Sequence, residues 1–348
     1  MRRDVKRPQL VIVTPALRDA NNGNWQTAQR WARMLSADYR VRLAAGWDGP
    51  SRDGSGADRG DDLLIALHAR RSAPAVAAWR QQRGGAPVML VLTGTDLYRD
   101  IGFDAAAQRS LAQADQLVVL NELGLRSLPA AWRSKARVCL QSCPTRLPGP
   151  KAARHLRALM VGHLREEKSP QTYFEAARLL AQRSDILLDH IGGALDPALA
   201  AQATALMQSH PHYRWLGNLP HGATRARIAR AHVLVHPSRM EGGAHVVMEA
   251  VCSGTPVLAS RIDGNLGLLG EDYPGVFEPG DAAGLALALQ RARDDGAMLP
   301  ALRLACAARA PLFLPERERQ TLAGLVAELL QAPRPTLLNP PEPHHERP

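Results

Sequence analysis

The sequence has few aromatic residues, few cysteines and no long apolar run, and each shortage argues against a class of protein. Aromatic side chains make up only 4% of the 348 residues, and the basic residues form no run interleaved with aromatics, so nucleic-acid binding is not expected. The four cysteines show neither a CxxC motif nor a Cys/His ligand spacing, which favours reduced, structural thiols over a metal site. The N-terminal apolar run, Leu10 to Val13, is too short for a signal peptide, and no segment approaches the roughly 20 apolar residues that cross a bilayer. We therefore expect a cytoplasmic protein without stable membrane association.

The formal net charge of +10 leaves two interpretations open. A basic protein can bind nucleic acid, and its affinity would then fall steeply with salt. However, only four of the 43 basic residues are lysines, and this arginine bias is as typical of GC-rich coding as of function. The same charge also suits a small anionic ligand, and the motifs described below favour that second interpretation.

The chain is long enough for two domains, because 348 residues exceed the size at which one hydrophobic core usually keeps growing. Short β-rich apolar runs alternate with amphipathic stretches, and their continuous hydrophobicity is typical of parallel strands buried on both faces. The runs begin at Leu10, Val41, Asp62, Pro87, Gln116, Arg157, Asp185, His232 and Pro256. A Pro/Gly-rich patch at 142–154 separates the two sets of runs.

This pattern predicts two doubly wound α/β domains, which would bind ligands at the carboxyl ends of their strands. Residues 1–150 would form the first domain, and residues 151–332, with a last helix at 316–332, would form the second. The Pro-rich tail at 333–348 is expected to be flexible.

The segment HPSRMEGGAHVVMEA places Glu241 and Glu249 eight positions apart, on either side of a helix start that we predict near Ala244. Gly242 and Gly243 leave no side chain over this helix N-terminus. Its free N–H groups, at about 243–246, could therefore meet a phosphate or a sugar hydroxyl.

The two glutamates would then have different roles. Glu249 lies one helical turn beyond His245 on the same face, and a carboxylate can accept two hydrogen bonds from a vicinal diol such as a ribose. Glu241, on the loop, would lie nearer to the reacting centre. Alternatively, Glu249 only complements the helix N-terminus and the glycines only form a turn.

The segment GHLREEKSPQTYF predicts a strand, a loop and a helix with Ser169 as its N-cap and Pro170 in its first turn. Lys168 comes directly before this helix, and with Arg165 it would form a cationic clamp for a diphosphate. Alternatively, both are solvated surface charges beside the neighbouring glutamates.

The first domain is expected to bind the acceptor. A Gly/Asn loop with Gly23 and Asn24 precedes a helix and could approach the donor phosphates. The apolar stripe of that helix is expected in the core and consists of Trp25, Ala28, Ala32 and Leu35. Two clusters follow predicted strands and would face a small anionic acceptor. They are His68, Arg70 and Arg71 after one strand, and Thr93, Thr95, Asp96, Tyr98 and Arg99 after the next.

Together these motifs make the second half, about 155–330, similar to the C-terminal domain of retaining nucleotide-sugar glycosyltransferases with the GT-B fold. The resemblance rests on the E-x7-E element, the glycine-rich helix start, the Gly162 to Lys168 loop, and GTPVLAS followed by DGNLGLLG. It implies two Rossmann-like domains facing across a cleft. It further implies that Lys168 binds the donor diphosphate, Glu249 the ribose and Glu241 the transferred sugar.

In that family, backbone amides that match Gly243, Ala244, His245 and Val246 hold the diphosphate and the sugar. One position departs from the pattern, since the family usually has arginine where this chain has His163, and Arg165 would have to compensate. The sequence also contains no D-x-D triplet, so we expect no bound metal and no cofactor.

Across about 10–330, the motifs NNGNW, ALHARRSA, LTGTDLYRDI, GHLREEKSP and HPSRMEGGAHVVMEA resemble the selenosugar synthase of bacterial selenoneine biosynthesis. This resemblance implies transfer of a sugar from a UDP-sugar, of the UDP-GlcNAc or UDP-glucose type, to selenophosphate. A carbon–selenium bond would form, with release of UDP and phosphate. It also makes a handover of the selenosugar to a later enzyme of the pathway an expectation.

From the motifs we also expect roles for the polar residues of the first domain and for Glu241. Glu241, Asp96 and His68 would be catalytic, and Gly23 would join the donor site. Asn24, Arg70, Arg71 and Thr95 would bind the acceptor. No histidine follows the fourth predicted strand, which suits an already ionised chalcogen nucleophile that needs orientation more than a base.

Two other enzymatic functions stay open at this point. One is a conventional GT-B transferase that acts on a hydroxyl of a lipid or a small metabolite. The other is a nucleotide-sugar epimerase or hydrolase, which would need a general base for C2 chemistry or for water.

Overall fold

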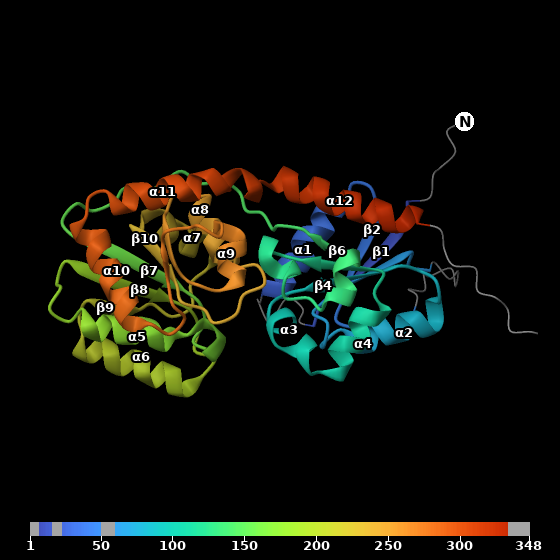
Figure 1. The fold of residues 1–348 in the computed structure, drawn as a ribbon, viewed down its shortest axis with the longest axis horizontal. Helices are drawn as coiled ribbons and strands as arrows, with labels where there is room; N and C mark the ends of the chain where they lie inside the picture. Colours follow the sequence, from blue (N-terminus) through green and yellow to red (C-terminus); the bar gives the residue numbers. More distant parts are fainter. Residues whose placement is uncertain (1–6, 16–22, 50–59, 333–348) are drawn as a thin grey trace, which may run out of the picture. The chain divides into compact units, whose positions relative to one another are not determined.

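The computed structural model describes residues 7–15, 23–49 and 60–332, which form two parallel six-stranded sheets flanked by helices (Figure 1). The predicted tail at 333–348 lies outside these residues. Within the described residues, no helix is both long and apolar enough to cross a membrane.

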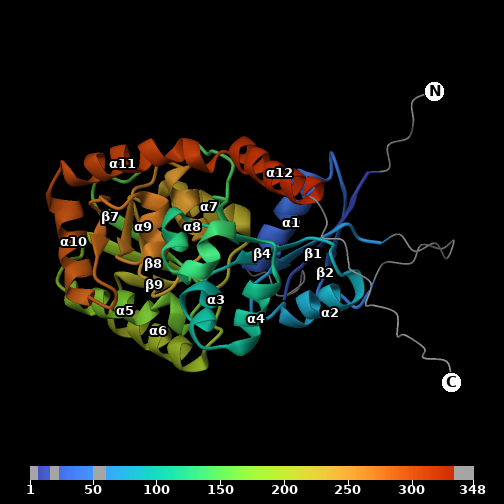
Figure 2. The same cartoon turned by 45° about the vertical axis from the view of Figure 1, so that its right-hand side comes forward.

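The first sheet has the strand order β2-β1-β3-β4-β5-β6. Its strands are β1 (Gln9–Val13), β2 (Arg40–Ala44), β3 (Leu63–Leu67), β4 (Val88–Leu92), β5 (Gln116–Val119) and β6 (Ala136–Val138). The helices of this half are α1 (Gly23–Leu35), α2 (Ala73–Arg83), α3 (Thr95–Tyr98) and α4 (Ala105–Gln113), with short 3₁₀ helices η2 (Asp100–Gly102), η3 (Glu122–Leu125) and η4 (Ala130–Lys135). Every residue of β3 and β4 is buried, as expected for central strands covered on both faces. Helices α2 and α4 pack side by side (Figure 2).

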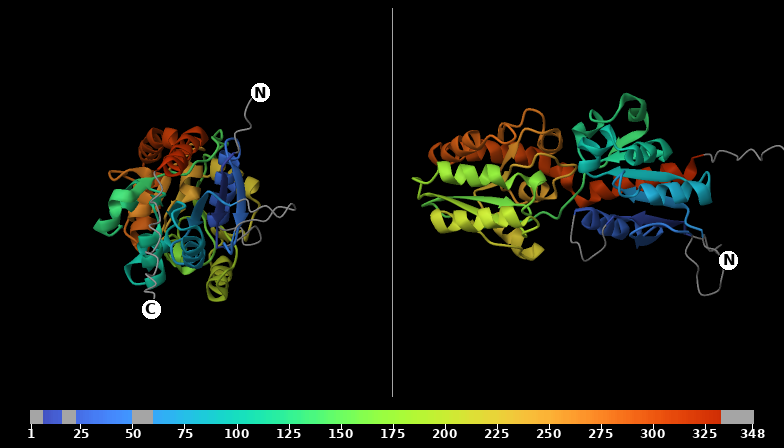
Figure 3. Two further views of the ribbon diagram at one scale, coloured as in Figure 1. Left: turned by 90° about the vertical axis from the view of Figure 1, so that its right-hand side faces the viewer. Right: turned by 90° about the horizontal axis from the view of Figure 1, so that it is seen from below.

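The second sheet has the order β12-β11-β10-β7-β8-β9 and lies between two layers of helices (Figure 3). Its strands are β7 (Leu156–Val161), β8 (Ile186–Ile191), β9 (Tyr213–Trp215), β10 (Val233–His236), β11 (Val257–Ser260) and β12 (Val276–Phe277). One layer holds α5 (Pro170–Leu179), α6 (Pro197–Ser209) and α10 (Ala282–Asp294). The other holds α7 (His221–Arg230), α8 (His245–Val251), α9 (Asp263–Leu269) and α11 (Met298–Arg309). The remaining elements are η5 (Glu166–Lys168), η6 (Ala310–Phe313) and α12 (Pro315–Gln331).

The described residues divide into two compact units whose boundaries differ from those of the sheets. Unit 1 takes the described parts of Met1–Val91, Phe103–Leu117 and Leu322–Pro348, and unit 2 takes Leu92–Gly102 and Val118–Thr321. The candidate site described below lies within unit 2. The domain ranges 1–150 and 151–332 stay a prediction.

Two local predictions need correction. The buried stripe of α1 consists of Thr27, Ala28, Trp31 and Leu35, whereas Trp25 and Ala32 are only half-buried, so the helix is rotated from the expected face.

Ser169 does precede α5, but it adopts a left-handed conformation with φ of 48° and its side chain makes no capping hydrogen bond. Its hydroxyl instead lies 2.9 Å from the hydroxyl of Thr172.

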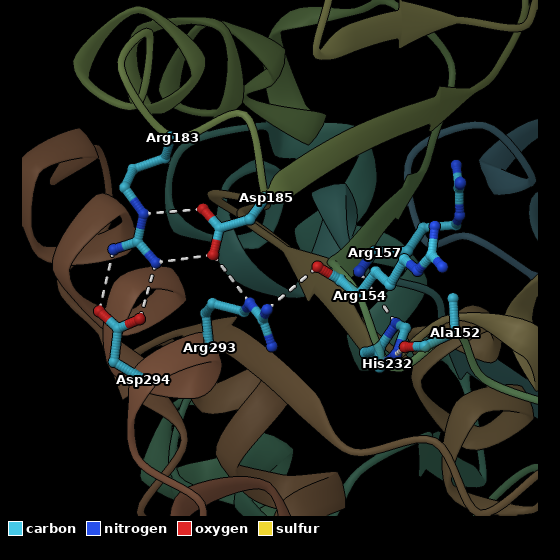
Figure 4. A network of polar contacts seen from close by, with 8 residues as sticks. All are labelled: Ala152, Arg154, Arg157, Arg183, Asp185, His232, Arg293 and Asp294. Carbon is cyan, nitrogen blue, oxygen red and sulfur yellow. Dashed lines mark hydrogen bonds and ion pairs between the residues drawn. The ribbon is translucent and has the colours of Figure 1, made fainter.

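Hydrogen bonds between arginines and aspartates join α10 to the segment that leads into β8 (Figure 4). Arg183 donates to Asp185 at 2.9 Å and 3.1 Å and to Asp294 at 2.9 Å and 2.7 Å. Arg293 of α10 donates to the same Asp185 at 2.8 Å and to the carbonyl of Arg154 at 3.0 Å. Arg183 holds the pKa of the Asp185 carboxyl well below its usual value although partial burial raises it. The network therefore ties the segments that enter β7 and β8 to a covering helix.

Candidate functional site

Lys168 and Glu241 form an ion pair where β7 and β10 end. The Lys168 side chain, on η5, packs along Gly162, and its ammonium donates to Oε1 of Glu241. The Nε2 atom of His236, the last residue of β10, lies 3.2 Å from the same oxygen. The Glu241 side chain is only 11% exposed, so its charge is compensated mainly by the Lys168 ammonium, with the His236 ring as a close polar neighbour.

These neighbours fix the charge state of Glu241. Burial raises the pKa of the Glu241 carboxyl, but the Lys168 ammonium and the His236 ring outweigh it and hold the pKa well below its ordinary value. Burial lowers the pKa of His236, and Lys168 lowers it further, although Glu241 acts in the opposite direction. At neutral pH, Glu241 is therefore an ionised acceptor of hydrogen bonds and not a proton donor.

Two glycines allow other loops of unit 2 to approach Glu241 closely. A Cβ atom on Gly264, in the first turn of α9, would overlap the carbonyl oxygen of Glu241. A Cβ atom on Gly242 would overlap the backbone of Thr93 in the loop after β4. In addition, the Nδ2 atom of Asn121 donates to the carbonyl of Gly242 at 2.8 Å. The backbone around Glu241 is thus held from both sides.

Glu249 lies on α8 and is held by two histidines. His221 Nε2 lies 2.6 Å and His245 Nδ1 lies 3.3 Å from the same oxygen, Oε1. Arg225 is 4.0 Å from it. Burial raises the pKa of Glu249, but His221 and His245 lower it to about 2. In return, the hydrogen bond to Glu249 raises the pKa of His221 above 6.5, against burial and Arg225.

The start of α8 agrees with the predicted position near Ala244. The helix begins at His245, with Ala244 as an N-cap whose side chain makes no hydrogen bond. Gly243, Ala244, His245 and Val246 therefore form the first turn and its approach. Their role toward a donor stays a prediction.

His163 and Arg165 lie on the loop that leads to Lys168. The Nδ1 atom of His163 accepts a hydrogen bond from the amide of Gly193 at 3.0 Å, so the other ring nitrogen is the one available for donation. Burial lowers the pKa of His163, and the charges of Arg165 and Lys168 lower it further. The Arg165 side chain is exposed. Lys168 pairs with Glu241 here. The diphosphate clamp of Lys168 and Arg165 stays a prediction.

Asp96 holds the backbone of the loop after β4 through hydrogen bonds. Its Oδ1 atom accepts hydrogen bonds from the amides of Thr93 at 2.8 Å and Gly94 at 2.9 Å, and the side chain is fully buried. Thr95 begins α3 and is half-buried. The structure thus gives Asp96 a loop-shaping contact, while its catalytic role and the acceptor role of Thr95 stay predictions.

The other predicted acceptor residues lie in unit 1. His68 follows β3, is buried and has a φ of 76°, and its Nδ1 atom accepts from the amide of Arg71 at 3.4 Å. Arg70 is half-buried and Arg71 is exposed. Gly23 and Asn24 form the first turn of α1. Their roles stay predictions.

Sequence reasoning missed several residues that surround Glu241. Among the buried side-chain atoms without a hydrogen-bond partner in the described residues are Nε2 of His236, Oγ of Ser238 and the Oδ1 atoms of Asn121 and Asn265. His236 Nε2 is near Glu241 but misaligned for a hydrogen bond. A histidine at the end of the predicted strand HVLVH was a visible signal. Asn265 lies in the segment DGNLGLLG, which contributed to the resemblance, but it was not singled out. Asn121 carried no signal, because it lies on a segment far away in the sequence.

Comparison with known proteins gives a family match for part of the chain, which we call the family segment. Residues 149–311 match the family model "Glycosyl transferases group 1". This family segment contains Lys168, Glu241 and Glu249. The glycogen synthase of Mycobacterium tuberculosis is 37% identical over 120 residues, which cover 34% of this chain and 28% of that protein. The match therefore spans less than a third of the curated relative.

Solved structures resemble the chain over most of its length. The sucrose-phosphate synthase of Thermosynechococcus elongatus is 19% identical with a TM-score of 0.76, and the match covers 94% of this chain and 100% of that one. Anabaena HepE, solved with UDP and glucose, is 15% identical with a TM-score of 0.72, covering 92% and 100%. The chain therefore has the predicted fold of two Rossmann-like α/β domains, the GT-B fold.

Proposed function

We propose that the chain is a glycosyltransferase that uses a UDP-sugar, in its finer form a selenosugar synthase. The observation that carries the proposal is the pairing of Lys168 with Glu241, with Glu249 held by histidines on α8, within the family segment. The curated relative is named a glycogen synthase, and Anabaena HepE was solved with UDP and glucose, which supports the same donor class.

The donor would be held by charge and by hydrogen bonds. Lys168 would exchange part of its contact with Glu241 for the diphosphate and stabilise the charge that develops on departing UDP. Glu241, ionised by its neighbours, would accept hydrogen bonds from sugar hydroxyls. Glu249 has one oxygen engaged by His221 and His245, which leaves the second for the ribose diol.

Selenophosphate is proposed as acceptor because of the whole-chain resemblance of the motifs. A selenium lone pair would attack the anomeric carbon and form the C–Se bond, while the bond from that carbon to the UDP oxygen breaks and its electron pair leaves with UDP. Water would then cleave the Se–P bond and release phosphate. An anionic nucleophile needs no general base. Its negative charge would suit Arg70 and Arg71, and Asn24 and Thr95 would be further ligands of the acceptor. His68 and Asp96 would be the catalytic groups on this side. A cytoplasmic location, independence of metal and a handover of the product belong to the same proposal.

The test is mass spectrometry of the products after incubation with UDP-GlcNAc or UDP-glucose and fresh selenophosphate under anaerobic, reducing conditions. We expect a selenium isotope envelope on the sugar with stoichiometric UDP. Lys168→Ala is the control and should suppress both products. UDP release with free sugar alone would favour a hydrolase, and no UDP from either donor would reject the donor-site proposal.

A conventional transferase that acts on a hydroxyl is the second candidate. It is favoured by the partial match to a protein that is named a glycogen synthase. UDP release that depends on a hydroxyl acceptor and not on selenophosphate would select it.

A further inference from the structure

A pocket of about 530 Å³ lies at the opposite edge of the second sheet. Its lining includes His155 and Arg157 at the start of β7 and His232 just before β10. Leu159, Asp189 and Arg214 line it from within β7, β8 and β9. The last turns of α7 form another wall through Arg227 and Arg230. This volume is in the range that accommodates a small ligand.

A buried carboxylate forms the floor of the pocket. Asp189 is 1% exposed and lies within β8. Arg157 donates to its Oδ2 atom at 2.8 Å, and Arg214 donates to its Oδ1 atom at 2.9 Å and 2.8 Å. Asp189 is therefore neutralised by two arginines that come from the neighbouring strands β7 and β9, and these contacts hold both guanidinium groups in place.

Two more arginines, Arg227 and Arg230, line the pocket. Arg227 lies 3.9 Å from Asp189, beyond hydrogen-bond distance. Arg230 is exposed and has no hydrogen-bond or ion-pair partner among the described residues. Four arginines against one carboxylate leave three positive charges around the pocket.

His232 lines the pocket as a neutral side chain and adds no charge to it. Its Nδ1 atom accepts from the amide of Arg157 at 2.9 Å, and its Nε2 atom lies 2.8 Å from the carbonyl of Ala152 (Figure 4). These contacts fix the neutral tautomer that is protonated at Nε2, and burial lowers the pKa of the ring. The histidine therefore fixes the backbone of Arg157 at the pocket rim.

The pocket is separate from the candidate donor site. β7 carries Arg157 near its first residue and leads at its other end to Gly162 and the loop of Lys168. Arg157 and Gly162 are five residues apart, which corresponds to about 16 Å along the strand. Neither Lys168, Glu241 nor Glu249 lines the pocket.

We propose that this pocket binds the phosphate group of a small phosphorylated molecule. Guanidinium groups match phosphate oxygens with paired hydrogen bonds, and four converging arginines supply more donors than Asp189 consumes. The concave shape, with alanine side chains from α7 among the lining residues, favours a compact ligand over an extended nucleic acid.

The experiment is isothermal titration of the full chain with inorganic phosphate, comparing wild type with Arg227→Gln/Arg230→Gln. The double variant should weaken the affinity by roughly tenfold or more, because two charged hydrogen-bonding groups are lost. The matched control is Arg178→Gln/Arg291→Gln, which removes the same charge from exposed positions on α5 and α10. It should bind phosphate as wild type does. Lys168→Ala should also retain binding, since its site lies at the other strand ends.

Equal affinity in wild type and Arg227→Gln/Arg230→Gln would overturn the proposal, as would equal losses in that variant and its control. Arg230→Gln alone guards against misfolding, because Arg230 has no partner to lose, and it should still weaken binding measurably. Loss in Lys168→Ala only would assign the phosphate to the donor site. Cosedimentation with phosphatidic acid vesicles, if it required Arg227 and Arg230 while free phosphate did not bind, would replace the small ligand by a lipid headgroup.

Discussion

Glu241 and Glu249 keep their charges by different means, although both are nearly buried. Glu241 relies on a lysine, whose charge does not change near neutral pH, and on a histidine that burial keeps neutral. Glu249 relies on two histidines, one of which has a raised pKa. A pH change near neutrality therefore acts on the surroundings of Glu249 before it acts on those of Glu241.

The substitution Glu249→Gln tests this coupling. The hydrogen bond to Glu249 is the main cause of the raised pKa of His221, and burial and Arg225 both lower it. Without the carboxylate, the pKa of His221 should fall to 6.5 or below, as measured by NMR titration of the ring. If Glu249 binds the ribose, the KM for the UDP-sugar should also rise by about tenfold to a hundredfold.

Glu278→Gln is the matched control, because Glu278 pairs with Arg261 on the exposed surface. It should change neither quantity. A His221 pKa that stays above 6.5 in Glu249→Gln would contradict the assigned cause.

The substitution Gly264→Ala tests the backbone support of Glu241. An alanine Cβ would overlap the carbonyl of Glu241, so the loop must move and the ion pair with Lys168 must change. We expect turnover to fall by about tenfold or more, since misplacement by about 1 Å has large effects on positioned groups. The measurement is kcat with the donor at saturation.

Gly324→Ala provides the comparison. Gly324 is an exposed residue of α12 with open space around its missing side chain. There alanine should stabilise the protein by about 0.5–1 kcal/mol through helix propensity and leave kcat unchanged. Equal kcat values in the two variants would show that Glu241 is not held through Gly264.

At the scale of single residues, the sequence was informative about residues that lie in one motif. Lys168, Glu241 and Glu249 were named from spacing and resemblance, and all three lie where β7 and β10 end or on the helix that follows. His221 was missed because it reaches Glu249 from α7, 28 positions away. Hydrophobic periodicity gives no information on such a contact between two helices.

At the scale of elements, burial decided which strands could be predicted. All nine runs predicted as strands form strands, because central parallel strands are continuous in hydrophobicity. The three strands that were missed, β6, β9 and β12, are two or three residues long and lie at sheet edges. An edge strand is short and half-exposed, so it leaves almost no pattern in the sequence.

Asp185 connects α10 to the second sheet, and the substitution Asp185→Asn tests how much this connection stabilises the protein. Asp185 accepts charged hydrogen bonds from both Arg183 and Arg293. The variant should lose about 1–2 kcal/mol of unfolding free energy at pH 7, measured by urea denaturation. Because the pKa of Asp185 is depressed, this contribution is present above its unfolded value of 3.8 and disappears as the pH falls below it.

Glu316→Gln is the control for this prediction. Its partner Arg319 is one turn away on the same helix and both are exposed, so the loss of unfolding free energy should lie within the error of the measurement. Equal losses in the two variants would mean that the network adds nothing beyond ordinary surface pairs.

At the scale of the whole molecule, alternating runs predicted two doubly wound sheets, and the structure confirms this fold. The compact units were not predictable in the same way. The loop after β4 and residues 118–321 belong to unit 2, with contacts such as that of Asn121 with Gly242. Such contacts depend on single side chains and glycines and not on a repeated pattern.

The second sheet carries both proposed sites, one at each end of its strands, and this arrangement leads to a prediction for the stability of the whole chain. A ligand at about 100 times its Kd stabilises the folded state by about 2.7 kcal/mol. Sites more than about 10 Å apart without shared partners act additively within about 0.5 kcal/mol. UDP and inorganic phosphate together should therefore raise the free energy of unfolding by the sum of their separate effects. Lys168→Ala should abolish only the UDP part and Arg230→Gln should reduce only the phosphate part, whereas competition between the two ligands in wild type would mean that they occupy one site.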